Sequence, residues 1–551
     1  MTARSPQGPA CVQTEATRSE RIGVTRHHER GNHVRAALVR ARTEGLAAGR
    51  EELRPLAEDL ARRFQWASAE LFEPSLPVAP VPEADHLMPL LGGLLDEAGL
   101  SRLSLRLRVL FQLQSLCRDV HPEPVIDFVG PLRSGGRRPV ERAQPWLQVS
   151  RFIQQLRRIV RRLDRRFFYP AARSLGETFD AWLEPAEAAW LVRLTRAATL
   201  ALGETQLPTG DVAERAAVRA AASYIAQRIL RQGHAGFGDL RDAVAGSDAK
   251  LPDVIGPLSW RRDDPLLRAD AKLAADLDGI YSRGEVYLRS LHSLQALLFG
   301  TALGRALSRY LLFPFGTAFL LLEFVHHLLA VFGWHVPLVN WPTEVVVGAI
   351  AALVFNVAAV RAALLWPFRA LGARIRSRRR LAGEEEARPG RMTSLLRGLS
   401  AWTEAAFRSL KDRLDVVGHR VDEAVRFRGY DRRHVRWVRA AIGLLWFFAS
   451  YLFRFLFRLV VEPTINPIKH FPTVTVAGKI SVASLLPIVS TQLVAVLPPS
   501  LAGPLAGLIC VFMVPGFAGF LIWELKENWR LFAANRRPSL AVIRPGPGGE
   551  T

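Results

Sequence analysis

The sequence predicts an all-α, polytopic membrane protein with a large helical cytoplasmic N-terminal region. Three features support this fold class. Every long apolar run of the 551-residue chain lies after Leu311. The residues before that point follow helical periodicity and show no alternating pattern. The charged residues between the apolar runs are distributed in a way that orients the chain in a bilayer.

The composition narrows the classes of protein that the chain can belong to. It holds 73 basic and 51 acidic residues, for a net charge of +22. This excess alone is weak evidence for a nucleic-acid partner, and its placement follows the apolar segments, so nucleic acid is not an expected partner. The three cysteines are too far apart for a disulfide framework or a metal site. The first 50 residues lack the apolar core of a signal peptide, so we expect the N-terminal region to stay in the cytoplasm.

Shifts in composition divide the chain into six segments. These are a polar tail ending in a proline-rich linker (1–84), a helical cytoplasmic region (85–310), a transmembrane hairpin (311–366), a basic cytoplasmic helical loop (367–439), a C-terminal transmembrane region (440–524) and a basic tail (525–551).

Several helices are expected before the membrane region. Ala36 to Trp66 has the composition of one helix, and four prolines between Glu73 and Pro82 forbid continuous helix after it. The clearest helix is Val212 to Leu230, because it follows the turn Pro208-Thr-Gly-Asp211.

The apolar runs are long enough to cross a bilayer. The first has 22 residues, or roughly 33 Å as a helix, which exceeds the hydrocarbon thickness of about 30 Å. The expected membrane segments are Leu311–Phe332, Val345–Trp366, Ala440–Val461 and Ile480–Trp523, the last of them divided at Leu497–Ser500.

The loops predict the orientation of the first two spans. Residues 367–440 carry 19 basic and 9 acidic side chains, whereas Gly333 to Thr343 has no charged residue but contains Trp334 and Trp341. Basic loops stay in the cytoplasm and tryptophans favour the headgroup zone. The first two spans should therefore form a hairpin with its tip outside, in a cell membrane such as the bacterial inner membrane.

The C-terminal topology is left open by the same rule. If Ala440–Val461 and both halves of the last run all cross, the basic tail ends up outside, against the charge rule. Either the last run crosses once with a re-entrant piece, or a span such as Leu291–Leu312 has been missed. We expect four or five spans and a cytoplasmic C-terminus.

One predicted helix, Val149 to Phe168, is both basic and amphipathic. Its apolar face suits insertion into anionic lipid, although packing on neighbouring helices is the more usual fate of such a face. The arginines that would meet anionic lipid at the cytoplasmic face are Arg157, Arg158, Arg161, Arg162, Arg165 and Arg166.

Ionisable residues inside the apolar runs form a second candidate site. Glu323, His326 and His327 share one helical face of the first span. Their possible partners in other spans are Arg361, Arg454 and Arg458. Such residues either build an ion or proton path or fix helix packing.

The sequence favours a non-enzymatic membrane scaffold or anchor that binds lipid or protein partners. The alternatives are a small transporter or channel that uses the Glu323 cluster, and a membrane-bound enzyme. No phosphate-binding loop, dinucleotide fingerprint, His-Glu-x-x-His or nucleophile elbow is present, so no cofactor, metal or catalytic residue is predicted. The segment Trp523–Arg530, with two tryptophans and mixed charges, is interpreted as a juxtamembrane motif.

Overall fold

The computed structural model describes residues 32–72, 81–98, 104–117, 125–126, 141–142, 144–164, 170–205, 209–247, 249–252, 264–334, 337–367, 427–428, 433–457 and 481–532, with a few single residues elsewhere. Within them the chain is almost entirely α-helical, as the sequence predicts. Two helices in these ranges are long and apolar enough to cross a membrane, or three if a pair bent at a short break is counted as one span.

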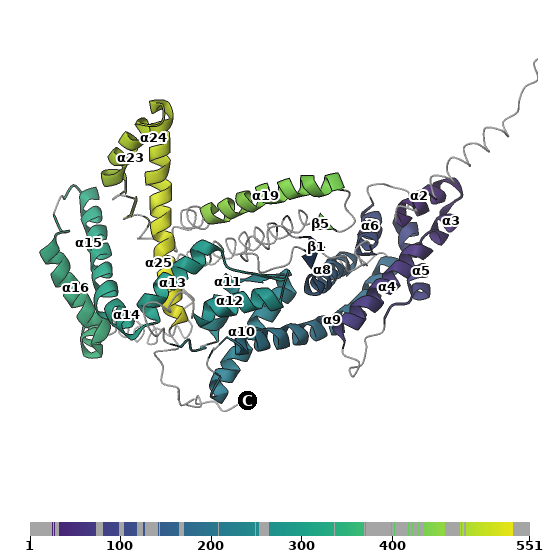
Figure 1. The fold of residues 1–551 in the computed structure, drawn as a ribbon, viewed down its shortest axis with the longest axis horizontal. Coiled ribbons are helices and arrows are strands. Elements are labelled where there is room, and N and C mark those ends of the chain that lie inside the picture. Colours follow the sequence, from purple (N-terminus) through teal and green to yellow (C-terminus); the bar gives the residue numbers. More distant parts are fainter. Residues whose placement is uncertain are drawn as a thin grey trace, which may run out of the picture.

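The helices before the apolar hairpins share one continuous core, and we call them the N-terminal module (Figure 1). They are α2 (His33–Thr43), α3 (Leu46–Glu51), α4 (Arg54–Leu71), α5 (Ala84–Ala98), α6 (Leu105–Cys117), α8 (Pro145–Asp164), α9 (Pro170–Gly203), α10 (Val212–Gln232), α11 (Phe237–Gly246), α12 (Pro265–Asp276) and α13 (Val286–Phe299). At the centre the Phe64 ring lies 4.9 Å from that of Trp182 and 5.4 Å from that of Phe152. Large buried aromatic rings of this kind dominate the energetics of a core.

The predicted helix after Pro208 is confirmed as α10, and its ends follow from local chemistry. Asp211 accepts a hydrogen bond from the backbone of Ala213, while Glu214 reaches back to the Asp211 amide at 3.3 Å. This reciprocal cap satisfies amides that a helix start leaves without partners. At the other end Gly233 adopts φ +88°, a left-handed conformation that glycine accepts without strain.

Short strands join distant parts of the chain. β1 (Val125–Ile126) lies between β2 (Glu141–Arg142) and β5 (Phe427–Arg428), and both pairings are antiparallel. β3 (Ala235–Gly236) and β4 (Tyr281–Ser282) pair in parallel. Because β1 lies between α6 and α8 in the sequence, the pairing with β5 brings the end of the basic loop beside this N-terminal part of the chain.

The first predicted hairpin is present, and its first helix begins earlier than expected. α14 (Ala302–Leu307), the π-helical turn η1 (Ser308–Leu312) and α15 (Phe313–Val331) form one apolar helix that packs along α16 (Trp341–Asn356). The stretch long and apolar enough to cross is Ala302–His326. The two helices approach closely because Gly348 has no Cβ, which would otherwise overlap the Phe315 ring.

The second expected span is broken. α16 ends at Asn356, and the following helix, Ala358–Pro367, turns away by 101°. Sixteen residues of α16 cover roughly 24 Å, which is less than the hydrocarbon core. The run Val345–Trp366 is therefore two helices at a sharp angle and differs from the straight helix that hydropathy predicts.

The last apolar run folds into a second hairpin. The π-helical turn η3 (Ser481–Leu485) and α23 (Leu486–Val494) pack against α24 (Pro499–Leu508) and the π-helical turn η4 (Ile509–Met513), which continue into α25 (Val514–Leu531). The fully buried Ser481 hydroxyl donates to the carbonyl of Cys510. Since a π-turn disturbs the regular backbone hydrogen bonds, this contact satisfies a carbonyl where η3 meets η4.

The third expected span, Ala440–Val461, corresponds to α19 (Arg433–Leu456), and it lies differently from the two hairpins. Figure 1 shows α19 running crosswise to the upright α25 and α15. Its C-terminal part packs on α13, where the Tyr287 ring lies 6.0 Å from that of Tyr451 and 5.2 Å from that of Phe455. The basic loop before α19, which the sequence predicts to be helical, lies almost wholly outside the described residues.

Candidate functional site

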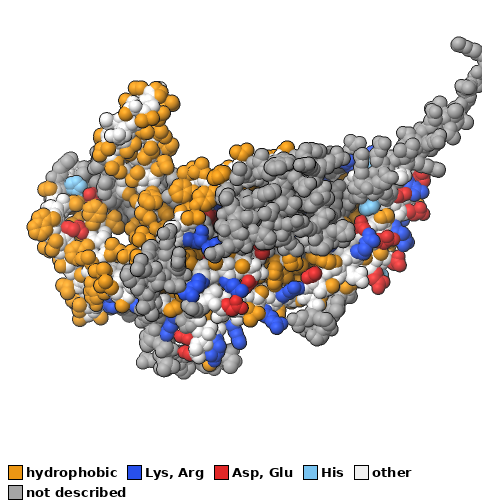
Figure 2. Space-filling model, in the orientation of Figure 1, with side chains coloured by type: hydrophobic (Ala, Val, Ile, Leu, Met, Phe, Trp, Pro, Cys, Tyr) orange, Lys and Arg blue, Asp and Glu red, His pale blue; other side chains and the backbone are white. Residues whose placement is uncertain are grey.

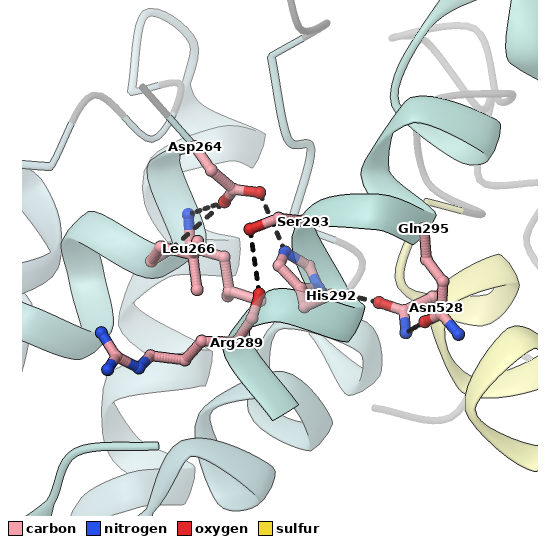
Figure 3. A network of polar contacts seen from close by, with 8 residues as sticks. Asp264, Leu266, Arg289, His292, Ser293, Gln295 and Asn528 are labelled. Carbon is pink, nitrogen blue, oxygen red and sulfur yellow. Dashed lines mark hydrogen bonds and ion pairs between the residues drawn. The ribbon is translucent and has the colours of Figure 1, made fainter. Parts of the chain in front are cut away.

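The main polar site lies where the end of α25 enters the N-terminal module, and we call it the α25 joint (Figure 3). Two helices of the module, α11 and α13, pack against α25 there, and the start of α12 contacts α13 beside them. The joint consists of Arg241, Asp264, His292, Gln295, Glu524 and Asn528. All of these except Arg241 are at least nine-tenths buried as residues.

His292 is the centre of the joint. Its Nε2 donates to Asp264 Oδ2 at 2.9 Å and its Nδ1 donates to Asn528 Oδ1 at 2.8 Å. The Asn528 amide nitrogen donates to Gln295 and to the Glu524 carbonyl, which turns the amide oxygen toward the imidazole. Because both ring nitrogens face acceptors, the imidazole is held as the doubly protonated cation.

The pKa of His292 agrees with that geometry. Burial lowers the pKa of the imidazolium, but the charge of Asp264 and the hydrogen bonds to Asp264 and Asn528 outweigh burial, so the pKa stands above its usual value. Burial raises the pKa of Asp264, and the charge and hydrogen bond of His292 bring it below the usual range. The pair is therefore a buried ion pair with its hydrogen bonds satisfied.

Asp264 is positioned by its place in the sequence. It stands before Pro265 at the start of α12, where it accepts hydrogen bonds from the backbone of Leu266 at 2.8 Å and Leu267 at 3.2 Å. Proline suits the first helical position because its missing N–H needs no partner there. One carboxylate oxygen thus caps α12 and the other holds His292.

A second buried ion pair lies beside the first. The guanidinium of Arg241 in α11 contacts both carboxylate oxygens of Glu524, one of them at 3.3 Å. Burial lowers the pKa of Arg241, but the charge of Glu524 and the hydrogen bond to it raise the pKa above its usual value. A two-point contact of this kind fixes the rotation of α25 as well as its distance from α11.

An aromatic group closes the joint on the side of the first hairpin. The ring of Trp529 lies 5.5 Å from that of Phe299 and 4.8 Å from that of Phe313. Phe299 ends α13, and Phe313 begins α15. The same turn of α25 therefore touches the module and the base of the first apolar hairpin.

Asp270 supports the joint from within α12. This fully buried carboxylate accepts hydrogen bonds from the Tyr281 hydroxyl at 3.0 Å and from the Gly284 amide at 3.2 Å. Burial raises the pKa of Asp270 to about 6, although these hydrogen bonds oppose the shift. Its contacts hold the segment that leads into α13, the helix that carries His292.

The α25 joint is suited to holding helices together. Each charge in its two ion pairs faces an opposite charge, and the side-chain amides of Gln295 and Asn528 are hydrogen-bonded to each other. Removing one member of such a pair leaves an uncompensated buried charge, which is strongly destabilising. Among the residues that the structure describes, no group of three or more His, Cys, Asp or Glu side chains has the geometry of a metal site.

The predicted amphipathic helix is α8, and its apolar face is covered by protein. The side chains of that face are all buried: Phe152, Ile153, Leu156, Ile159, Val160 and Leu163. Of the two outcomes considered for this face, packing on neighbouring helices, the more usual one, is observed. The reason is that α4, α6, α9 and α10 of the module surround it.

The arginines of α8 differ in their surroundings. Arg157 pairs with Glu187 and donates to the Leu230 carbonyl at 2.8 Å. Arg158, Arg161 and Arg162 are exposed, and Arg165 and Arg166 lie outside the described residues. Contact of the exposed arginines with anionic lipid stays a prediction.

Two of the arginines predicted to join the intramembrane cluster have described contacts, and both lie with other residues. Arg454 lies 3.9 Å from Glu285 of α13 and donates to Ser450 of its own helix, and Arg361 donates to the Phe355 carbonyl at 3.3 Å. These contacts belong to α13, α16 and α19, so they give no support to the arrangement on which the transporter alternative depends.

The acidic and histidine members of that cluster lie on α15. Glu323 and His326 are half-buried there. The helix also contains His327, whose side chain lies outside the described part, as does the whole of Arg458. Their role as an ion or proton path stays a prediction.

Sequence reasoning missed most of the α25 joint. Glu524, Asn528 and Trp529 lie within the segment Trp523–Arg530 that was singled out, but the signal was interpreted as contact with lipid headgroups. His292 and Asn528 are 236 positions apart, so no local spacing connects them. The sequence did contain one signal of the joint, which is the polar face with Glu524 and Asn528 at the end of an apolar helix.

Comparison of the chain with protein-family models, with curated proteins and with solved structures found no match.

Proposed function

We propose that the chain is an integral membrane protein that holds its N-terminal module rigidly at the bilayer, as a non-enzymatic scaffold or anchor. The observation that carries this proposal is the α25 joint. A single helix, Pro499–Leu531, begins in an apolar hairpin and ends inside the core of the module. Because the helix ends inside the module, such an anchor fixes the orientation of the module, whereas a flexible linker would leave it free to turn.

The length of that helix supports the proposal. It has 33 residues, or roughly 50 Å, of which a bilayer accommodates about 30 Å of hydrocarbon. The remaining length matches the segment whose side chains enter the module, from Phe520 to Phe532.

The surface of the apolar hairpins agrees with burial in lipid. Large apolar side chains are exposed along both of them, among them Leu311, Val346, Ile350, Leu501 and Leu508. Figure 2 shows these regions as nearly continuous hydrophobic surface, whereas charged side chains gather over the module. Exposed apolar surface of this extent marks a membrane or protein contact, and the basic loop 367–440 favours a cytoplasmic module.

The partner of the anchor is the bilayer, with anionic lipid at its cytoplasmic face. Exposed arginines on α8 supply charges of the required sign, each of which contributes about 1 kcal/mol of attraction when it lies near an anionic surface. A protein partner for the module is compatible with the scaffold role.

Two measurements test this proposal. Alkaline carbonate should leave the full-length protein in the membrane pellet, because it strips only peripheral proteins. In a chain whose three cysteines are replaced, V496C at the turn of the second hairpin should react with an impermeant maleimide from outside. L200C on α9, which is also exposed, should react only from the cytoplasmic side. Release by carbonate, or labelling of both cysteines from the same side, would refute the proposal.

A further inference from the structure

The surface of α19 is apolar on the side that faces away from the module. Among its described residues, exposed apolar side chains recur at intervals of three or four residues, with Phe453 beside them: Val438, Ile442, Leu445, Phe448, Leu452 and Leu456. This spacing places them on one helical face. We call this set the α19 stripe.

Near its C-terminal end, the other side of α19 contacts the module through polar and aromatic side chains. Arg454 lies 3.9 Å from Glu285, and Tyr451 and Phe455 contact Tyr287 of α13. In a water-soluble domain an amphipathic helix turns its apolar face inward and its polar face outward. At this end of α19 a charged side chain faces the module and the exposed side chains are apolar, which is the arrangement expected where hydrocarbon covers the outer face.

The segments at both ends of α19 contact parts of the chain that precede the first hairpin. Before its start, Arg428 pairs with Val125 in the β1–β5 ladder. Near its end, Arg454 meets Glu285. A single helix whose two ends are attached to a domain on one side of a bilayer does not cross that bilayer.

We infer that α19 lies along the membrane surface as a non-spanning helix, with the α19 stripe in contact with phospholipid hydrocarbon. The inference rests on the proposed membrane location of the chain. Figure 2 supports lipid as the occupant, because hydrophobic surface continues from the region of α25 to the upper edge of α19. Six arginines between Arg426 and Arg439 precede or begin the helix and suit anionic headgroups.

This arrangement removes the conflict at the C-terminal end. If α19 does not cross, the second hairpin starts on the side of the module and returns to it through α25. The basic tail then lies on the cytoplasmic side, as the charge rule requires. The expected third span, Ala440–Val461, becomes a surface helix.

Labelling from each side of the membrane tests the topology. In the cysteine-free chain, G429C precedes α19 in the sequence, and T464C follows the apolar run. A surface helix predicts that both react only in inside-out vesicles, whereas a spanning helix predicts reaction from opposite sides. V496C, labelled from outside in both cases, reports separately whether the chain is inserted at all. If V496C behaves as expected but G429C and T464C react from opposite sides, only the inference on α19 fails.

Lipid contact is tested by quenching. The protein is reconstituted in phosphatidylethanolamine and phosphatidylglycerol vesicles that contain a phospholipid with a nitroxide on its acyl chain. A fluorophore on L445C should be quenched as strongly as one on L508C of α24, and severalfold more than one on V192C of the module, which is equally exposed. Quenching at L445C no stronger than at V192C would show that water or a protein covers the stripe.

Discussion

Arg309 and Asn356 join the two helices of the first hairpin at its base. The Arg309 Nε donates to Asn356 Oδ1 at 2.6 Å, and the Asn356 amide donates back to the Arg309 carbonyl at 3.3 Å. Arg309 lies in the π-helical turn η1 and Asn356 is the last residue of α16 before the 101° bend. The pair therefore stands where both helices leave regular geometry, and each residue satisfies a polar group that an apolar environment would leave without a partner.

Replacement of Asn356 by leucine should destabilise the hairpin. The substitution leaves the Arg309 guanidinium without its acceptor at the base of the hairpin. The midpoint of thermal unfolding in detergent should fall. N356D keeps the acceptor and loses the donor, so it should fall less. Equal midpoints for N356L and the wild type would mean that the pair has no structural role.

The His292–Asp264 pair predicts a loss of stability as the pH rises above neutral. A group whose pKa is raised in the folded state stabilises fully below its unfolded pKa, about 6.5 for histidine. That contribution disappears as the pH passes the folded pKa of His292, which lies above the usual value. The wild type should therefore lose stability as the pH rises above about 6.5, as measured by thermal unfolding.

The variant H292Q/D264N is the matched comparison for that pair. It removes both charges while keeping polar side chains, so its unfolding midpoint should change less than that of the wild type over the same pH range. H292Q alone should be the least stable, since it leaves the Asp264 carboxylate buried without a counter-charge, at about 3–5 kcal/mol. Parallel pH profiles for wild type and double variant would contradict the assignment of an imidazolium.

Asp270 predicts a pH effect in the acidic range. Its pKa is raised from 3.8 to about 6 by burial, so the folded protein binds a proton that the unfolded chain has already lost. The stability that comes from the neutral Asp270 carboxyl is therefore present below about pH 4 and is lost as the pH rises through 6. D270N should flatten this part of the profile, because asparagine accepts from Tyr281 and Gly284 without ionising. An unchanged slope between pH 4 and 6 would show that another group is responsible.

The Arg241–Glu524 pair predicts a strong pairwise coupling. R241M or E524Q alone should lower the free energy of unfolding by about 3–5 kcal/mol, since each leaves one buried charge without a partner. R241M/E524Q together should cost much less than the sum of the two. The free energies come from the unfolding of all four proteins in detergent. Additive effects would mean that the two side chains act independently and that the joint is held by its other contacts.

Hydropathy predicted the existence of the hairpins better than their limits. The first helix begins at Ala302, nine residues before the predicted start at Leu311, because Arg305 and Arg309 lower the hydropathy of its first turns. Their guanidinium groups find partners at the base of the hairpin: Arg305 donates to the Phe299 carbonyl at 3.3 Å and Arg309 to Asn356. A sequence shows a charged residue but not the partner that makes it tolerable inside an apolar helix.

For the amphipathic helices the limit was of another kind. The pattern of α8 describes an apolar face correctly, yet only the fold shows that Phe152 meets Phe64 and Trp182 and no lipid. For α19 the error is the opposite one. Its hydropathy, to which Leu445 and Phe448 contribute, predicts a membrane span, but the sequence does not show that Arg454 lies on the side facing α13. The α25 joint was out of reach because its partners come from segments more than 200 positions apart.

Because the helix Pro499–Leu531 is longer than the hydrocarbon core of a bilayer, lipid composition should affect the orientation of the module relative to the membrane. A transmembrane helix adapts to a thinner or thicker bilayer chiefly by changing its tilt. Here the C-terminal end of the helix is held to α11 by the Arg241–Glu524 ion pair and to α13 by the hydrogen bonds of Asn528 with His292 and Gln295. In the proposed membrane arrangement, a change of tilt therefore turns the whole module relative to the membrane plane, so the thickness of the bilayer selects which face of the module points away from it.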